Sequence, residues 1–302
     1  MKFYSKLLLF GEFTIINGSA ALATTYPAFS GHWTTQDTPH FLQKSLREFI
    51  NYVLKLAQHD DILFDLQTDM LQKDIDSGLF FESNIPQGYG LGSSGALCAA
   101  LYATYAKSPM QAPFTATAIV SLRAIFAQLE SHFHGSSSGI DPLICYLNQP
   151  LLFKSRTDAA LTDIPEYSTG NGGLFLLDSQ HPRQTGPLVN FFVERSKDEQ
   201  FKALCAQEII PYTNHCITAF LEKDIDTLHQ NIRLLSAFQL AHYTLMVPNF
   251  IRPYFEKGLV NDAYTLKIFG AGGGGFFLGF TRDFEHTKAL LKDFPLYLLY
   301  RF

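Results

Sequence analysis

The spacing of apolar and polar positions predicts a mixture of strands and helices in the first half of the chain. Near the start, apolar runs flank the turn pair Asn17-Gly18, which is typical of a β-hairpin and would place Lys6 near the hairpin's entrance. Further along, apolar residues recur at helical spacing. The predicted strands cover 7–10, 13–16, 20–23, 62–66, 79–82, 150–153 and 173–177, and the predicted helices cover 40–58, 96–105 and 114–133.

The second half continues this mixture. Its predicted helices cover 188–205, 224–243, 250–257 and 284–291, and its predicted strands cover 264–269, 276–280 and 296–300. Because helices and strands do not alternate strictly, the pattern favours the α+β class. A length of 302 residues suits two packed domains, and we place their boundary near residue 180, giving domains at 1–180 and 181–302.

Composition narrows the class of protein. Apolar residues make up 47% of the chain and charged residues only 17%, which indicates a globular protein with a sizeable core. The formal net charge of −5 provides no broad positive field for nucleic acid. The apolar run at 7–10 is too short for a signal peptide, and no run approaches the roughly 20 apolar residues of a membrane-spanning helix.

Cysteine usage indicates the compartment. The four cysteines are spread without C-x-x-C spacing in a chain large enough to fold without disulfides, so we expect reduced thiols. We therefore expect a soluble, cytoplasmic protein, a monomer or homodimer, without nucleic-acid or membrane partners.

The most informative segment is the glycine-rich stretch 86–96, which lies between a predicted strand and a predicted helix. Glycines let backbone N–H groups approach a ligand closely, and a helix N-terminus adds free donors and the positive end of the helix dipole, so the segment suits phosphate. It is not a Walker loop, because no Lys follows the last glycine of a G-x-x-x-x-G-K pattern. The alternative is a flexible loop in which Ser93 or Ser94 only caps the helix.

A second glycine cluster at 270–275 formally contains G-x-G-x-x-G. A dinucleotide site needs a helix after this motif, whereas an apolar, strand-like run follows here. The cluster is therefore predicted to connect two strands, either as a bulged hairpin or as a close approach to another backbone or a ligand.

A third segment, 130–141, places Glu130 in the last turns of an apolar helix and Asp141 in the serine-rich loop beyond it. A carboxylate in such a helix must be solvated, paired or metal-bound. Magnesium fits, because it prefers one or two protein oxygen ligands with phosphates and water, and Ser94 with Glu130 would suffice. The alternative is a Glu on the solvent face of the helix.

Two other chemistries are excluded by spacing. His132 and His134 lie two positions apart, which points them to different faces of a helix, and no third ligand is spaced to complete a zinc site. The G-x-S-x-G elbow of a serine nucleophile is absent around Ser93.

These segments resemble, in order and spacing, the GHMP kinase superfamily and, within it, the mevalonate kinases. The resemblance rests on 6–12 with Asn17-Gly18 (first motif), 86–96 (phosphate-binding second motif), 130–141 (magnesium Glu and catalytic Asp), 178–185 (a substrate-side strand and turn) and 267–275 (third motif). It implies a two-domain GHMP kinase fold, with an N-terminal α+β domain, a C-terminal ferredoxin-like α+β domain and the active site between them. It also implies ATP and Mg²⁺ as cofactors and a mevalonate-like small molecule as acceptor.

The resemblance assigns roles residue by residue. Asp141 would orient or deprotonate the acceptor hydroxyl, Lys6 would keep Asp141 ionised, and Glu130 with Ser94 would hold magnesium. The implied nucleotide contacts are Pro86, Gly88, Gly90, Leu91, Gly92, Ser93, Ser94, Gly272, Gly273 and Gly274, and the implied acceptor contacts are Glu12, His134, Arg183, Thr185 and Ala271.

Two positions depart from the family pattern. Phe13 stands where mevalonate kinases usually carry His, and Gly95 replaces the usual Ala after the paired serines. The first departure leaves the acceptor open. A phosphomevalonate or sugar kinase, a lyase of the diphosphomevalonate decarboxylase kind, and a non-catalytic nucleotide-binding module therefore stay as alternatives to a mevalonate kinase.

Overall fold

The structure is a computed structural model that describes residues 1–35, 44–155, 158–183 and 185–302. The chain forms two compact units, each assembled from three segments. The first unit contains Met1–Leu7, Thr24–Pro86 and Leu91–Gln149, and the second contains Leu8–Ala23, Gln87–Gly90 and Pro150–Phe302. The chain therefore crosses from one unit to the other several times, whereas the domain limits expected from the sequence form a single cut at residue 180, which stays a prediction.

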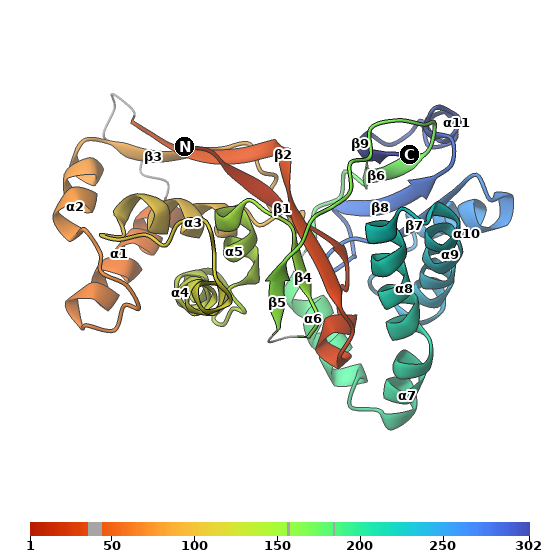
Figure 1. Cartoon of the computed structure of the whole chain (residues 1–302), viewed down its shortest axis with the longest axis horizontal. Helices are drawn as coiled ribbons and strands as arrows, with labels where there is room; N and C mark the ends of the chain where they lie inside the picture. The colour runs from red at the N-terminus through yellow and green to blue at the C-terminus, as the bar shows by residue number, and fades with distance from the viewer. Residues whose placement is uncertain (36–43, 156–157, 184) are drawn as a thin grey trace. The chain divides into compact units, whose positions relative to one another are not determined.

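The first unit combines strands with five helices. Its elements include β2 (Ala21–Thr35, from Thr24 onward), β3 (Leu79–Ser83), α1 (Lys44–Gln58), α2 (Thr68–Asp76), α3 (Ser93–Tyr105), α4 (Ala116–His134) and α5 (Ile140–Leu147). Residues 31–35 of β2 pair antiparallel with β3. Helix α3 is buried along most of its length, because α4 and α5 both pack against it (Figure 1). The start of α3 is thereby held rigidly in the unit.

The second unit is built on a four-stranded antiparallel sheet. Its elements are β4 (Leu151–Phe153), β5 (Ala159–Leu161), β6 (Gly173–Asp178), α6 (Thr185–Arg195), α7 (Glu199–Gln207), α8 (Ile209–Glu222), α9 (Ile225–His242), α10 (Arg252–Asn261), β7 (Tyr264–Ile268), β8 (Phe276–Thr281), α11 (Phe284–Leu290) and β9 (Leu296–Arg301). The strand order is β7-β8-β6-β9, and β6 pairs with β8 from Gly173↔Thr281 to Asp178↔Phe276.

This order identifies the fold of the second unit. The chain runs β6, helices, β7, β8, α11, β9, which is the β-α-β-β-α-β order of ferredoxin-like folds. Helices α9 and α10 contact β7, and β7 and β8 are buried throughout (Figure 1). The expected α+β class and the ferredoxin-like C-terminal part are confirmed.

The opening hairpin is confirmed only in part. The strand β1 (Phe3–Phe10) is followed by a 3₁₀ helix, η1 (Thr14–Asn17), so the expected strand at 13–16 is wrong. Phe13 has a φ of 61°, and the N–H groups of Ile15 and Ile16 donate to the carbonyls of Gly11 and Phe13 at 3.2 and 2.9 Å, so the chain turns here instead of extending. The next strand, β2, pairs with β1 and extends to Thr35, far beyond the expected 20–23.

Other differences concern individual elements. The expected strand at 62–66 reduces to one bridge, Leu66↔Ala106. The expected helix at 188–205 is two helices, because the Asp198 side chain accepts from the Phe201 N–H and begins α7 anew. Helices α2, α5 and α8 were not predicted. Of the expected helix at 40–58, residues 40–43 lie outside the described part of the chain.

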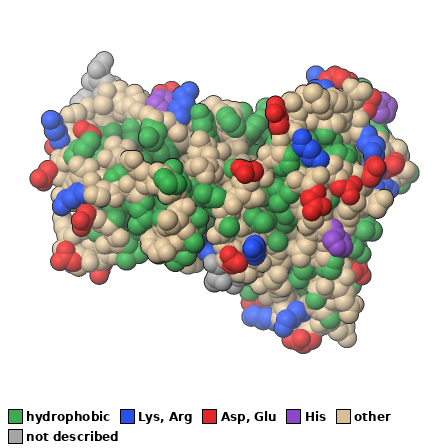
Figure 2. Space-filling view, in the orientation of Figure 1, with side chains coloured by type: hydrophobic (Ala, Val, Ile, Leu, Met, Phe, Trp, Pro, Cys, Tyr) green, Lys and Arg blue, Asp and Glu red, His purple; other side chains and the backbone are tan. Residues whose placement is uncertain are grey.

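Surface charge is mixed on the face in Figure 2, where Lys and Arg side chains lie among Asp and Glu. All four cysteines are buried free thiols, as expected. Within the described residues, no helix combines the length and hydrophobicity needed to cross a membrane.

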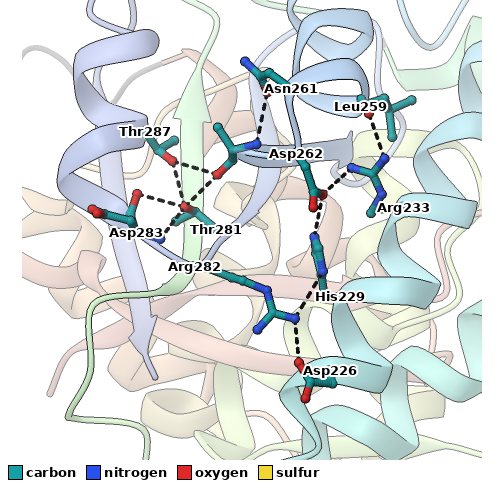
Figure 3. A network of polar contacts seen from close by, with 11 residues as sticks. Asp226, His229, Arg233, Leu259, Asn261, Asp262, Thr281, Arg282, Asp283 and Thr287 are labelled. Carbon is teal, nitrogen blue, oxygen red and sulfur yellow. Dashed lines mark hydrogen bonds and ion pairs between the residues drawn. The ribbon is translucent and has the colours of Figure 1, made fainter.

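A network of ion pairs connects three elements of the second unit (Figure 3). Asp262, which ends α10 in the left-handed conformation, accepts from Arg233 at 2.6 Å and lies 3.1 Å from the His229 ring. Arg282, which follows β8, pairs with Asp226 at 2.6 Å. The network therefore joins α9, the end of α10 and the end of β8.

We expect Asp262→Asn to destabilise the protein by about 1 kcal/mol, because the network loses a charge that is partly exposed. Asn tolerates the left-handed backbone, so this variant isolates the charge, whereas Asp262→Ala adds backbone strain and should cost more. Urea unfolding of both variants measures the difference. Equal losses of stability in the two variants would show that the ion pairs of Asp262 contribute little to the stability of the protein.

Candidate active site

The site in the first unit starts at the N-terminus of α3. Gly92, at φ 73°, turns the chain into the helix, and its carbonyl accepts from the Ala96 N–H at 2.9 Å. Ser93 and Ser94 occupy the first turn of α3. The free N–H groups of this turn and the helix dipole make it suitable for an anion, as the glycine-rich segment predicted.

Gly95 has a specific packing reason. A Cβ atom at this position would lie 2.8 Å from the backbone nitrogen of Pro142 and 2.9 Å from the carbonyl carbon of Asp141. The missing side chain therefore lets α3 touch the beginning of α5. The departure from the usual Ala, noted in the sequence, brings Asp141 close to the first turn of α3.

Asp141 and Lys6 form an ion pair of 3.0 Å. Lys6 lies in β1 with its side chain 9% exposed, whereas that of Asp141 is 34% exposed, so the carboxylate is the more accessible partner. The backbone N–H of Lys6 also donates to the carbonyl of Leu91 at 2.8 Å, which ties β1 to the glycine-rich segment. The expected pair is thus assembled.

The sequence suggested that Asp141 lies in a loop, and this prediction is wrong. Asp141 lies in the first turn of α5. Gly139 begins this helix at φ 70°, and a Cβ there would lie 2.2 Å from the carbonyl oxygen of Arg123 in α4. The Arg123 side chain donates to the Ser138 carbonyl at 3.0 Å. These contacts fix the start of α5 on α4, so the Asp141 carboxylate is held on a rigid element.

Glu130 is the buried acid of the site. Its residue is 5% exposed, and its carboxylate accepts from the hydroxyl of Ser94 at 3.2 Å and from that of Ser137 at 2.5 Å. Burial raises the pKa of Glu130 to about 7, assisted by the negative charge of Asp141 and opposed by the hydrogen bond from Ser137 and the charge of Lys6. The alternative of a solvent-exposed Glu is therefore wrong.

The donor set around Glu130 fits magnesium. Ser94 and Glu130 supply hard oxygen ligands. Burial disfavours the negative charge of Glu130, and a bound cation would offset this cost. His134 lies 3.3 Å from the Ser94 hydroxyl, which places its ring beside this pair. No group of three or more His, Cys, Asp or Glu side chains suited to a metal occurs in the described part of the chain.

The titration of Glu130 gives a testable prediction. Its native pKa of about 7 lies above its ordinary value of 4.5, so the folded state binds the proton more tightly and loses stability as the pH rises between these values. Without magnesium, we expect the wild type to lose on the order of 3 kcal/mol relative to Glu130→Gln between about pH 5 and about pH 8. Urea unfolding in a chelator measures this difference.

Glu48→Gln is the matched control, because Glu48 lies on α1 with its side chain 57% exposed. Its stability difference from the wild type should stay nearly constant over the same pH range. A pH-independent difference for Glu130→Gln as well would contradict the raised pKa.

In the second unit, Glu12 forms a buried ion pair. Its carboxylate lies 2.6 Å from the ammonium of Lys267, and the two side chains are 3% and 1% exposed. Lys267 also donates to the carbonyls of Leu9 and Ile268 at 3.1 and 2.8 Å. Glu12 and Lys267 therefore join the first motif to the strand that leads into the third, and the expected acceptor contact of Glu12 stays a prediction.

Arg183 also has partners that the sequence did not suggest. Its Nη1 donates to the carbonyl oxygens of Phe269 at 2.7 Å and of Gly272 and Gly274 at 3.3 Å, and its Nη2 donates to that of Tyr89 at 3.4 Å. Thr185 begins α6, and its side chain lies outside the described part. Ala271 is 6% exposed.

The second glycine cluster, at 270–275, connects β7 to β8, as predicted, and does not begin a helix. Gly270 and Gly272 to Gly275 all have positive φ. The N–H of Gly273 donates to the Met246 carbonyl at 2.7 Å, and that of Gly275 to the His181 carbonyl at 2.6 Å. These glycines are required, because few other residues adopt such a run of left-handed conformations.

Sequence reasoning missed two residues of these clusters. Ser137 donates the short hydrogen bond to Glu130, and nothing in a serine-rich loop distinguishes it from its neighbours. Lys267 could have been found, since a single Lys in the apolar strand 264–269 is rarely buried without a partner.

Comparison with known proteins identifies a related family for part of the chain. Residues 51–149 match the family model of the GHMP kinases N terminal domain. No curated protein matches the chain in a sequence search.

Solved structures extend the likeness to the whole chain. The mevalonate kinase of L. major in complex with R-mevalonate is 18% identical, with a TM-score of 0.63 over 96% of this chain and 89% of its own. The Streptococcus pneumoniae phosphomevalonate kinase in complex with phosphomevalonate and AMPPNP is 15% identical, with a TM-score of 0.64 over 99% and 98%. The Lactococcus lactis galactokinase complexed with galactose is 13% identical, with a TM-score of 0.66 over 99% and 93%.

Residues 51–149 thus match the N-terminal domain of the GHMP kinases, and the chain as a whole has the GHMP kinase fold.

Proposed function

We propose that this protein transfers the γ-phosphoryl group of ATP to a hydroxyl of a small molecule, with mevalonate as the first candidate acceptor. The observation that carries the proposal is the ion pair of Lys6 and Asp141 at 3.0 Å. It belongs to the same unit as the Ser94 and Glu130 pair at the start of α3. An activated acceptor group and a site for phosphate with its cation are the parts that phosphoryl transfer requires.

Each side chain has a physical task in this reaction. Asp141 accepts the hydrogen bond of the acceptor hydroxyl and takes its proton as the oxygen attacks phosphorus. Lys6, 3.0 Å from Asp141, orients this carboxylate and stabilises negative charge as it develops on the transferred group. The free N–H groups at the start of α3 bind phosphate oxygens.

Ser94 and Glu130 would hold magnesium, which, when bound, neutralises the phosphate charge. Because burial raises the pKa of Glu130 to about 7, the fraction that is protonated near neutral pH must release its proton when the carboxylate takes on this role. His134 lies 3.3 Å from the Ser94 hydroxyl, and its contact with the acceptor stays a prediction.

The acceptor depends on the position where mevalonate kinases carry His. Here Phe13 has a positive φ of 61° and is buried against Phe192 and Tyr243 at ring distances of 4.9 and 5.9 Å. An apolar ring in this cluster offers no polar contact to a substrate, so the acceptor must be held by other groups. Mevalonate is supported by the order of the motifs and by neighbours that bind mevalonate or phosphomevalonate.

The test is a coupled assay of ADP release over mevalonate, phosphomevalonate and a panel of sugars and amino alcohols, with Mg²⁺ and ATP. ADP release with mevalonate supports the proposal in full. ADP release only with phosphomevalonate or with a sugar would keep the kinase and replace the acceptor. Release of carbon dioxide would indicate the lyase, and ATP binding without turnover would indicate a binding module.

A further inference from the structure

The position of Arg183 suggests a role other than binding an acceptor carboxylate. The residue is 9% exposed, although Arg is among the residues that are rarely buried. The hydrogen bonds of its guanidinium described above all go to main-chain carbonyls. These carbonyls belong to two segments far apart in the sequence. One is Tyr89 in the second motif, and the other is the stretch 269–274 of the third motif.

Glycines make room for this guanidinium on both sides. A Cβ at Gly90 would lie 1.9 Å from Nη2 of Arg183, and a Cβ at Gly270 would lie 2.5 Å from the same atom. Either side chain would displace the guanidinium. These two glycines therefore have a packing role, in addition to any contact that their backbones make with a ligand.

Further contacts bring the same two segments together within the second unit. The backbone N–H of Arg183 donates to the carbonyl of Gly88 at 3.4 Å, and the Tyr89 ring packs edge-on against Phe276 at 5.1 Å. A Cβ at Gly275 would lie 3.1 Å from the Cα of Tyr89. The segment Gln87–Gly90 is thus packed on the third motif, with Arg183 joining the two.

We propose that Arg183 is a positioning residue that holds the two glycine-rich segments in the conformation that binds the nucleotide. Because the planar fork of Arg spreads its donors over separate nitrogens, Nη1 and Nη2 reach carbonyls on the two segments at once, whereas the donors of a Lys all lie on one nitrogen. The inference rests on the proposed ATP-dependent function. It moves Arg183 from the acceptor, where the resemblance placed it, to the nucleotide.

The experiment compares Arg183→Met, Arg183→Lys and wild type in two measurements. Titration with a fluorescent ATP analogue, without acceptor, should show nucleotide affinity weakened about tenfold or more in Arg183→Met, because several hydrogen bonds that order the segments are lost. With the acceptor found in the ADP-release panel, the KM for acceptor should change less than about twofold. A raised acceptor KM with unchanged nucleotide affinity would overturn the proposal.

The conservative variant separates geometry from charge. Arg183→Lys keeps the positive charge but not the fork, so its nucleotide affinity should resemble that of Arg183→Met, and full recovery by Lys would overturn the fork assignment. Arg252→Met is the matched control, because Arg252 also donates to a main-chain carbonyl of the second unit, that of Leu240 at 3.1 Å. Its nucleotide affinity should equal that of the wild type.

Hydrogen exchange provides a measurement that does not need turnover. In Arg183→Met, peptides covering 87–90 and 269–275 should both exchange faster than in the wild type, while β6 keeps its protection. If the wild type neither binds nor consumes ATP, the proposed function fails. The exchange measurement still tests whether Arg183 holds the two segments in place. Unchanged exchange in both segments would overturn the role of Arg183 even in an active enzyme.

Discussion

Asp141→Asn is expected to lower kcat by about a thousandfold, within the range that general acid–base groups contribute. The amide keeps the shape of the side chain but cannot take the acceptor's proton. Because Asp141 sits in the first turn of α5 and is fixed there by backbone packing, the variant should fold normally. Rates with the acceptor identified by ADP release measure the effect, and the KM for ATP should stay close to that of the wild type.

Asp65→Asn serves as the control for this change. Asp65 is an exposed residue of the same unit, outside the cluster at the start of α3, and its replacement should leave kcat unchanged. If Asp141→Asn retained near-normal turnover with an intact fold, Asp141 would not be the acid–base group, and the proposed mechanism would lose its main element.

Lys6→Met is the second large effect, with kcat expected to fall by about a hundredfold to a thousandfold, as for the loss of a single electrostatic contact in a transition state. Methionine keeps much of the aliphatic length of Lys6 but removes the charge 3.0 Å from Asp141. The KM for ATP should stay close to that of the wild type, because the substitution removes the charge beside Asp141 and not a nucleotide contact.

Lys2→Met is the matched control, since Lys2 precedes the same strand but is exposed. Its kcat should equal that of the wild type. Lys6 and Asp141 act on the same reacting group. The kcat of the double variant Lys6→Met with Asp141→Asn should therefore be only a little lower than that of the less active single variant. Fully additive losses would show that the two side chains act independently.

The acidic and basic groups of the first unit could be found from the sequence because each lies in a recognisable local pattern. Glu130 lies in an apolar helix, Asp141 follows a serine-rich stretch, and Ser94 begins a helix after closely spaced glycines. Periodicity correctly gave α3 and α4 and most strands of the second unit, since long apolar patterns depend little on distant partners.

Local patterns failed where packing over long sequence distances decides the conformation. Apolar residues at 13–16 suggest a strand, but the chain turns at Phe13, whose ring packs on Phe192, and a 3₁₀ helix follows instead. Helix α5 was missed because its eight residues contain Pro142 and follow two glycines, and it is stabilised by its contact with α3 and α4. Short elements depend on tertiary packing more than on propensity.

The sequence by itself determined the mixed α+β class and the start of a helix after closely spaced glycines, and it singled out Lys6, Ser94, Glu130 and Asp141. Phosphate binding at that helix start stays a prediction. The tertiary structure decided their state and their neighbours. Burial raises the pKa of Glu130, and the glycines at 95 and 139 let helices approach closely enough to hold Asp141 beside Lys6. Arg183, which the sequence assigned to the acceptor, donates instead to carbonyls contributed by segments nearly two hundred positions apart along the chain. Only the folded chain brings such carbonyls together, and that is why no local pattern could reveal this contact.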